Sequence, residues 1–508
     1  MAYVEKNYFT ECTTKEIIEK IVHYETLTSL WENAKKIYPN ELALMTINEK
    51  LTYAELDEKV AYFRALLKEH NVKKGDIVGL FITNSVDWVK VFLAIVTLGA
   101  VPTLLPPFLP KEALFGLSQK YHMNVLVYNS SLQETIDGLN TMPHHLDIIN
   151  SSDTSSNTVS SVNVDKKDPA CIIFTGGTTG KSKGALLSHQ AITRGAQNGC
   201  YGVRDPFHQR LLLVLPLTHV FGLVRNLLTS LQTGSTLWIC LNNKDMFKDI
   251  AIFKPTTIVM VPALAEMALN LSKQFKRNML GDSLEYIIAG ASTVPPYLVK
   301  EYKAYNITLL PGYGLTESAN LVSGNPNSEY KPASVGFPYP HQDLKIVDGE
   351  LLIKGDNVFD GYYLEEEENK NAFTEDGYFK TGDLVRFDEE GYLYIVGRIK
   401  DIIVLNTGEK LSPFDLENKF DELDLIQDCL LYLNEATNEL TLSVYPRYIE
   451  LNKLDVEDKI AYLKRQINQI NNNFPAHMRV NKIIIRKEDF TRTPAMKIIR
   501  KEINYGEN

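Results

Sequence analysis

The sequence has no long uninterrupted run of apolar residues and no excess of positive charge. Its most apolar stretch, residues 91–110, is broken by Gly99 and by prolines, whereas a span that crosses a bilayer needs about 20 consecutive apolar residues. The formal net charge of −10 disfavours nucleic acid as a main partner. The N-terminus lacks a basic region followed by an apolar run, so we expect neither a signal peptide nor an integral membrane segment.

Cysteines are few and scattered. There are five, an odd number, and none has the spacing of a metal site: Cys12, Cys171, Cys200, Cys240 and Cys429. Disulfides are rare in reducing compartments. We therefore expect buried free thiols and a cytoplasmic protein.

At 508 residues the chain is too long for a single hydrophobic core. A helix capped by Thr52 and Glu55 is expected to run toward His70, followed by a strand at 76–81, a helix at 88–98 and a strand at 100–105. This alternation predicts a parallel α/β sheet. Later segments predict a hairpin at 345–353 and, past residue 400, a small α+β unit with a helix near 455–473.

The most informative segment is residues 174–184, which read Phe-Thr-Gly-Gly-Thr-Thr-Gly-Lys-Ser-Lys-Gly between two apolar runs. Glycines allow close backbone approach to a ligand, and backbone N–H groups, hydroxyls and lysines can bind phosphate oxygens. A Walker A loop would need a glycine where Thr175 stands, and a helix directly after the loop. The spacing therefore disfavours a P-loop NTPase.

Four further motifs follow in order: Gly-Tyr-Gly-Leu-Thr-Glu at 312–317, Tyr-Phe-Lys-Thr-Gly-Asp at 378–383, Gly-Arg-Ile-Lys-Asp at 397–401 and Arg-Thr-Pro-Ala-Met-Lys at 492–497. With the phosphate loop, they resemble the adenylate-forming superfamily of acyl-CoA synthetases, adenylation domains and luciferases. The resemblance covers about residues 25–505 and is closest to fatty and related acyl-CoA ligases.

The resemblance implies an α/β fold: a large N-terminal domain of layered α/β sheets with a β-rich subdomain, and a small mobile α+β C-terminal domain. It implies a core over residues 1–396, a hinge at 397–400 with Lys400 at its pivot, and a lid over 401–508. In the implied reaction, ATP and a carboxylic acid give an acyl-AMP and pyrophosphate, and CoA then takes the acyl group as a thioester. Mg²⁺ is the implied metal.

The implied ATP site combines backbone groups with a few side chains. Lys183 matches the lysine that the family retains in its loop, Tyr313 would stack on adenine, and Asp383 would accept bonds from the ribose hydroxyls. The other implied ATP-binding residues are Thr175, Gly176, Gly177, Thr178, Thr179, Gly180, Gly290, Ala291, Ser292, Gly312, Gly314 and Arg398.

The resemblance also implies four catalytic residues. Thr316 would bond the α-phosphate, and Glu317 would hold Mg²⁺, a hard cation that bridges phosphate oxygens. Lys497 would bridge the carboxylate and the α-phosphate, although Ala495 and Met496 replace the usual Thr-Gly before it. Lys501 is the nearest competitor for this role.

Two further expectations concern the remaining catalytic residue and the thiol. His219 would gate or orient the acid; its alternative is a histidine of the core. Gly408 would line the tunnel for a pantetheine arm, where only a small residue fits.

The acid pocket and the acceptor thiol are less defined. Residues 216–223 resemble the family's acyl-pocket segment but lack the aspartate of amino-acid activators, which favours an aliphatic or aryl acid without an α-amine. The chain is expected to carry no fused carrier domain, because it ends soon after Lys497. CoA is the preferred acceptor, and a separate acyl or peptidyl carrier protein is the alternative. A non-catalytic nucleotide-binding homologue is the alternative of another class.

Overall fold

The chain forms two compact units. A computed structural model describes residues 9, 12–142, 145–152, 159–175, 183–405, 409–434, 437, 439–492 and 498–500. The first unit comprises Met1–Leu344, Ile353–Phe379 and Gly391–Leu393, and the second comprises Lys345–Leu352, Lys380–Glu390 and Tyr394–Asn508. The hinge expected at 397–400 lies close to Tyr394, where the longest segment of the second unit begins. That these residues act as a hinge between domains stays a prediction.

A nine-stranded sheet forms one layer of the first unit. Its six central strands are parallel, and its outer strands pair antiparallel. In spatial order the strands are β15 (Phe337–Pro338), β14 (Ser323–Gly324), β13 (Thr308–Tyr313), β12 (Tyr286–Ala289), β11 (Thr257–Met260), β9 (Arg210–Leu213), β10 (Thr236–Ile239), β1 (Leu42–Met45) and β2 (Lys50–Thr52).

A seven-stranded sheet forms the second layer. Its strands are, in order, β18 (Gly361–Tyr362), β8 (Lys183–Ser188), β7 (Pro169–Thr175), β4 (Val101–Leu104), β3 (Ile77–Phe81), β5 (Val125–Tyr128) and β6 (Asp147–Asn150). The strands from β7 to β6 are parallel, whereas β8 pairs antiparallel with both β7 and β18. The parallel α/β architecture expected from the sequence is confirmed.

Helices of the first unit follow the apolar patterning. Helix α3 begins with the expected capping box, in which Thr52 Oγ1 accepts from Glu55 N and the Glu55 side chain accepts from Thr52 N. The helices are α1 (Lys15–Lys20), α2 (Leu27–Ile37), α3 (Tyr53–Glu69), α4 (Val86–Thr97), α5 (Lys111–Lys120), α6 (Gln133–Ile136), α7 (His189–Asn198), the π-helix η4 (Phe221–Leu228), α8 (Thr229–Gln232), α9 (Met246–Phe253), α10 (Pro262–Phe275), α11 (Pro296–Lys303) and α12 (Glu366–Ala372).

The four-stranded sheet that supplies part of the second unit has the order β16 (Gln342–Val347), β17 (Glu350–Gly355), β19 (Phe379–Phe387) and β20 (Leu393–Arg398). The first two strands form the hairpin expected at 345–353. The turn between them contains Asp348 and Gly349, and both have positive φ. Glycine adopts that conformation without a steric penalty, which suits a tight turn.

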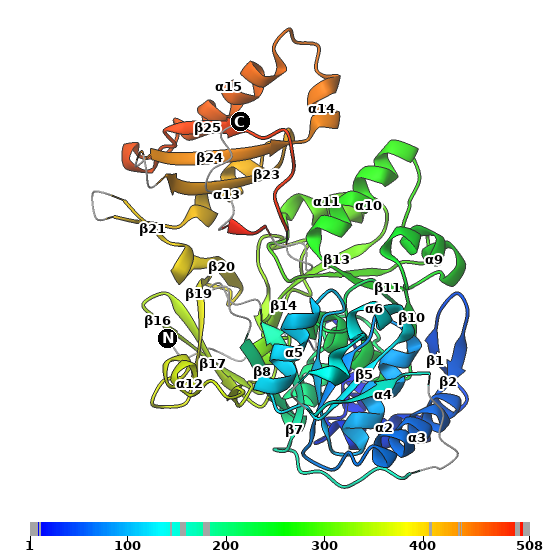
Figure 1. Cartoon of the computed structure of the whole chain (residues 1–508). Helices are drawn as coiled ribbons and strands as arrows, with labels where there is room; N and C mark the ends of the chain where they lie inside the picture. Colours follow the sequence, from blue (N-terminus) through cyan, green and yellow to red (C-terminus); the bar gives the residue numbers. More distant parts are fainter. Residues whose placement is uncertain are drawn as a thin grey trace. The chain divides into compact units, whose positions relative to one another are not determined.

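The rest of the second unit is a small α+β fold. Its strands are β21 (Ile403–Val404), β22 (Lys410–Leu411), β23 (Ile426–Asn434), β24 (Glu439–Pro446) and β25 (Lys482–Ile485), and its helices are α13 (Pro413–Asp421), α14 (Tyr448–Lys453) and α15 (Lys459–Asn471). Figure 1 shows α13 and α15 beside the sheet β23–β24–β25. Leu416, Phe420, Leu463 and Ile467 of these helices form its core together with the strands.

Within the described part of the chain, no helix combines the length and the apolarity that crossing a bilayer requires. The most apolar helix, α4, instead buries every residue except Asp87. A helix that is apolar on all sides belongs in a protein core or a bilayer. The helix expected at 88–98 and the strand expected at 100–105 are therefore confirmed as α4 and β4.

Candidate active site

The turn that carries Glu317 follows the carboxyl end of β13. A Cβ on Gly314 would lie 1.3 Å from the carbonyl oxygen of Asn320, so the backbone can approach this closely only at glycine. Leu315 N donates to Ser318 Oγ over 3.0 Å, and the Glu317 carbonyl accepts a bond from Phe359 N over 2.8 Å. The motif at 312–317 is therefore a tight turn that fixes the backbone of Glu317.

The side chain of Glu317 belongs to a connected polar group. Tyr362 Oη donates to Glu317 Oε1 over 2.7 Å, and the Tyr362 ring centroid lies 5.2 Å from Lys183 Nζ. Lys183 Nζ in turn lies 2.6 Å from Glu368 Oε2. The motif glutamate therefore contacts the hydroxyl of a tyrosine whose ring the loop lysine contacts. The two residues are 134 positions apart in the sequence (317 − 183).

Strand pairing holds this polar group together. Tyr362 of β18 pairs with Ala185 of β8, two residues beyond Lys183. The amide side chain of Asn369 bonds both backbone polar groups of Tyr362, accepting from N over 2.7 Å and donating to O over 2.8 Å. Tyr362 is therefore fixed by its backbone as well as by its hydroxyl.

The two ends of the expected phosphate loop are side by side. Thr175 closes β7 and pairs with Lys183, which opens β8. The apolar runs on either side of the segment therefore form two antiparallel strands, in agreement with the extended conformation that the sequence indicated. The loop residues themselves, Gly176, Gly177, Thr178, Thr179 and Gly180, lie outside the described part of the chain. Their role at phosphate stays a prediction.

The expected adenine side lies at the carboxyl ends of β12 and β13, which are parallel neighbours. A Cβ on Gly290 would lie 3.1 Å from the Gly312 oxygen, so the two glycine backbones approach closely. Ala291 has φ +69°, an uncommon conformation for a residue with a side chain. Ser292 follows Ala291, and Tyr313 ends β13. Ligands of open α/β sheets bind at this edge.

His219 precedes the π-helix η4 and is partly exposed. Its carbonyl accepts from Leu223 N over 2.9 Å, so it begins the helical turn. Phe221, two residues on, has its ring tip 3.4 Å from a Cβ built on Gly290. The segment expected to form the acid pocket therefore borders the expected adenine side.

In the second unit, Asp383 and Arg398 form a two-point ion pair. Arg398 Nε lies 2.5 Å from Asp383 Oδ1, and Nη2 lies 3.4 Å from Oδ2. The Asp383 residue is 2% exposed, and its backbone N–H donates to Thr381 Oγ1 over 3.1 Å. The carboxylate expected to bind ribose is thus held by the neighbouring motif's arginine.

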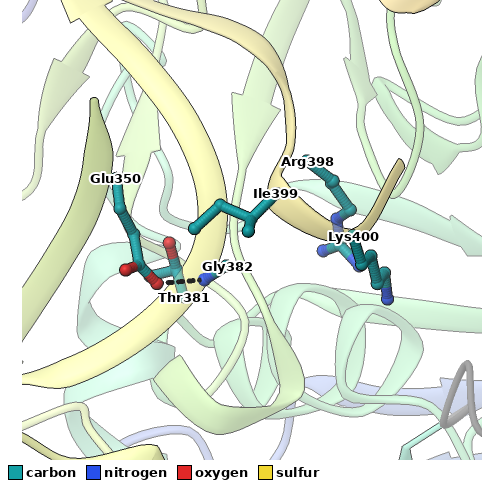
Figure 2. A pocket seen from close by; sticks show the side chains of 6 residues that line it. All are labelled: Glu350, Thr381, Gly382, Arg398, Ile399 and Lys400. Carbon is teal, nitrogen blue, oxygen red and sulfur yellow. Dashed lines mark hydrogen bonds between the residues drawn. The ribbon is translucent and has the colours of Figure 1, made fainter. Parts of the chain in front are cut away.

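A pocket of about 280 Å³ lies beside this pair, within the second unit. Figure 2 shows the six lining residues: Glu350, Thr381, Gly382, Arg398, Ile399 and Lys400. Glu350 Oε1 accepts a 2.9 Å hydrogen bond from the backbone N–H of Gly382, a residue with a positive φ of +70°. The expected hinge residue and the expected ribose-side arginine therefore line one pocket.

Two further expected site residues, Lys497 and Gly408, also lie outside the described part of the chain. The competitor Lys501 does so as well. Their roles stay predictions.

Sequence reasoning missed Tyr362 and Glu368. The acidic run at 365–368 is typical of a solvated surface helix, and its last three residues begin α12. However, Glu365 binds Lys120 over 2.5 Å and Glu368 binds Lys183. No local pattern connects Tyr362 with Glu317, because sheet pairing between distant segments creates that contact.

The chain matches two family models. "AMP-binding enzyme" matches residues 30–363, and "AMP-binding enzyme C-terminal domain" matches residues 400–505. The first model alone covers more than half of the chain. The chain therefore belongs to the AMP-binding enzyme family, that is, to the adenylate-forming superfamily.

Curated relatives are CoA ligases by name. A probable CoA ligase CCL9 of Humulus lupulus is 28% identical over 94% of this chain and 95% of the relative. An oxalate–CoA ligase of Arabidopsis thaliana is 28% identical over 94% and 98%. A long-chain-fatty-acid–CoA ligase of Salmonella typhimurium is 27% identical over 78% and 80%.

Solved structures share the fold. The anthranilate CoA ligase AuaEII, in complex with anthranoyl-AMP, has a TM-score of 0.83 at 22% identity, over 94% of this chain and 96% of that one. ATP-bound MatB from Rhodopseudomonas palustris has a TM-score of 0.81 at 22% identity, over 93% and 97%. At these identities the likeness shows the fold, which has a large N-terminal and a small C-terminal domain as expected.

Proposed function

We propose that this enzyme activates a carboxylic acid with ATP and transfers the acyl group to CoA. Family membership and relatives named as CoA ligases support an AMP-forming acid–thiol ligase. The observation that carries the proposal is the contact of Lys183 and Glu317 with one tyrosine, Tyr362, because it joins the phosphate loop to the metal motif.

In the first step, a carboxylate oxygen attacks the α-phosphorus of ATP and pyrophosphate leaves. The reacting groups are both anions, so positioning and charge neutralisation lower the barrier. Lys183 supplies a positive charge at one end of the loop, and Thr316 supplies a hydroxyl to the α-phosphate. We assign Lys497 to the carboxylate and α-phosphate, and His219 to the acid.

The Glu317 side chain fits a role toward Mg²⁺. Its Oε1 accepts from Tyr362, whereas Oε2 has no hydrogen-bond partner among the described residues. Mg²⁺ typically takes one or two protein carboxylates together with substrate phosphates and water. When bound, the ion neutralises charge on the phosphate oxygens.

In the second step, the thiol sulfur attacks the acyl carbon, AMP leaves and the thiol proton is released. We assign the domain movement that precedes this step to the 397–400 segment around Lys400, and the passage of the pantetheine arm to Gly408. A few backbone angles at such a segment can absorb a large rotation. A separate carrier protein presents the same arm and is the second candidate acceptor.

The cysteines favour a reducing compartment such as the cytoplasm. Cys171, Cys200, Cys240 and Cys429 are free and buried, and Cys12 is free and partly exposed. Burial raises the pKa of the Cys200 thiol to about 12, which makes it unreactive.

Pyrophosphate exchange tests the proposal. The full-length enzyme with Mg²⁺–ATP and a panel of aliphatic and aryl acids should incorporate labelled pyrophosphate into ATP in an acid-dependent manner. Product mass with CoA or a holo-carrier protein then identifies the acceptor. ATP binding without exchange for any acid would instead support the non-catalytic homologue.

A further inference from the structure

A buried arginine next to the expected acid pocket has no partner among the residues that the structure describes. Arg225 of the π-helix η4 is 4% exposed, yet its guanidinium makes no hydrogen bond or ion pair with any described residue. Its Cδ lies 3.3 Å from a Cβ built on Gly199, so the side chain packs against the end of α7. π-Helical turns occur frequently at functional sites.

The neighbours of Arg225 do not neutralise it. The groups that interact with its charge are Tyr339 and Cys200, and burial raises the pKa of each to about 12. Both are therefore uncharged near neutral pH, whereas arginine stays protonated in proteins even where burial lowers its pKa. An isolated buried charge costs several kcal/mol or more. Such an arrangement persists when a ligand supplies the missing anion.

Two buried amides nearby are also unsatisfied. Asn226 follows Arg225, and Asn198 precedes Gly199, against which the arginine packs. Both asparagines are fully buried, and neither the oxygen nor the nitrogen of either side chain has a hydrogen-bond partner within the described residues. Buried polar groups are normally bonded. The helix pair α7–η4 therefore holds a set of polar groups for which the described protein offers no partners.

This set of groups adjoins the nucleotide and acid side of the first unit. Phe221, at the start of η4, contacts the Gly290 position, and Arg225 follows it by about one helical turn. Tyr339, which interacts with Arg225, has its hydroxyl 2.3 Å from a Cβ built on Gly324. Gly324 pairs with Gly312 of the adenine motif. Arg225 therefore lies about one helical turn along η4 from the residue that borders the expected adenine side.

We propose that Arg225 binds a second anionic group at the far end of the acid, so that the substrate is a dicarboxylic acid or an acid with an equivalent terminal anion. A planar guanidinium binds a carboxylate at two points, and the unsatisfied amides of Asn198 and Asn226 belong to the same pair of helical segments. The proposal rests on the proposed function and narrows its substrate class.

The test compares chain-matched acids: succinate with butanoate, adipate with hexanoate, suberate with octanoate, and terephthalate with benzoate. For the best pair, the wild-type enzyme should prefer the diacid by about 10²-fold in kcat/KM of AMP formation, because a site built for a polar group strongly rejects the analogue that lacks it. Arg225→Met should abolish that preference, and Arg225→Lys should restore part of it.

Stability provides an independent readout. Arg225→Met should raise the Tm of the ligand-free enzyme by a few degrees, because it removes an uncompensated buried charge. The matched control is Arg194→Met. Arg194 is a buried arginine of α7 whose Nη2 is paired with Asp356 Oδ2 over 2.9 Å, so its loss should lower the Tm. The preferred diacid, added with a non-hydrolysable ATP analogue, should raise the Tm of the wild type but not of Arg225→Met.

The outcomes separate the two proposals. A wild-type preference for monoacids, or a diacid preference that persists in Arg225→Met, overturns the role of Arg225 and leaves the ligase intact. A failure of all acids to yield AMP overturns the ligase. The diacid-dependent rise in Tm then still decides whether Arg225 binds an anion.

Discussion

Two ion pairs involve the residues expected at the nucleotide, and their carboxylates differ in exposure. In the first unit, Lys183 is paired with Glu368, and the Glu368 side chain is 47% exposed. In the second unit, Asp383 is paired with Arg398, and the Asp383 side chain is 3% exposed. Water can therefore solvate the Glu368 carboxylate, whereas the Asp383 carboxylate is shielded from water.

The roles of the two acids differ accordingly. Glu368 is paired with the lysine expected to bind phosphate, so we expect it to compete with ATP for that lysine. Asp383 is itself the residue expected to bind ribose, and Arg398 orients it. Neutralising Asp383 should therefore impair the use of ATP, whereas neutralising Glu368 should improve it. The four predictions below run from the largest expected effect to the smallest.

Asp383→Asn should cause the largest loss. The neutral side chain cannot form the ion pair with Arg398, and it accepts ribose hydroxyls poorly. We expect kcat/KM for adenylation to fall by about 10²–10³-fold, and the Tm to drop only slightly, because the Arg398 side chain is 37% exposed and water can solvate it once the pair is lost. Pyrophosphate exchange and thermal melting measure the two effects. An unchanged KM for ATP would contradict the ribose assignment even if the protein were less stable.

Glu317→Gln should reduce kcat/KM by about 10²-fold, because it removes the charge that we propose for Mg²⁺ while keeping an oxygen for Tyr362. The Mg²⁺ concentration needed for half-maximal rate should also rise. Glu301→Gln is the matched control, because Glu301 forms only a surface pair with Lys273. Equal Mg²⁺ dependence in wild type and Glu317→Gln would exclude Glu317 from the metal site.

Tyr362→Phe should lower kcat about tenfold with little change in Tm. The variant loses the 2.7 Å bond to Glu317 but keeps the aromatic ring beside Lys183. A hydrogen bond to a charged group is worth about 1.5–3 kcal/mol. An unchanged kcat and an unchanged KM for ATP would indicate that the ring, which phenylalanine retains, and not the hydroxyl is the functional part.

Glu368→Gln should have the smallest effect, and in the favourable direction. The exposed pair contributes about 0–1 kcal/mol, and its loss leaves Lys183 available to phosphate. We expect KM for ATP to fall a few-fold at low salt, with kcat unchanged. Glu367→Gln, on the same helix but paired with Lys370, is the control. Weaker ATP binding in Glu368→Gln would show that Glu368 positions the lysine instead of competing for it.

Much of the fold could be predicted because it follows local pattern. The capping box of Thr52 and Glu55, the apolar run of α4 and the turn at Asp348-Gly349 are each encoded within a few residues. The motif at 312–317 is equally local, since Gly314 is required by the approach of Asn320 six residues away.

The contacts that shape the site could not be predicted in the same way. Tyr362 and Glu317 are 45 residues apart, and Lys183 and Glu368 are 185 apart. Each meets its partner only because β18 pairs with β8. Arg225 shows the same limit. An arginine in an apolar helix is conspicuous in the sequence, but only the packed structure shows that no described residue pairs with it.

Isotope transfer tests the central claim most directly. The enzyme is incubated with Mg²⁺–ATP, CoA and its acid labelled with ¹⁸O in the reacting carboxylate. The account predicts AMP that carries one ¹⁸O atom, because a carboxylate oxygen attacks the α-phosphorus and stays there when the thioester forms. Unlabelled AMP, or ADP with labelled inorganic phosphate, would contradict it.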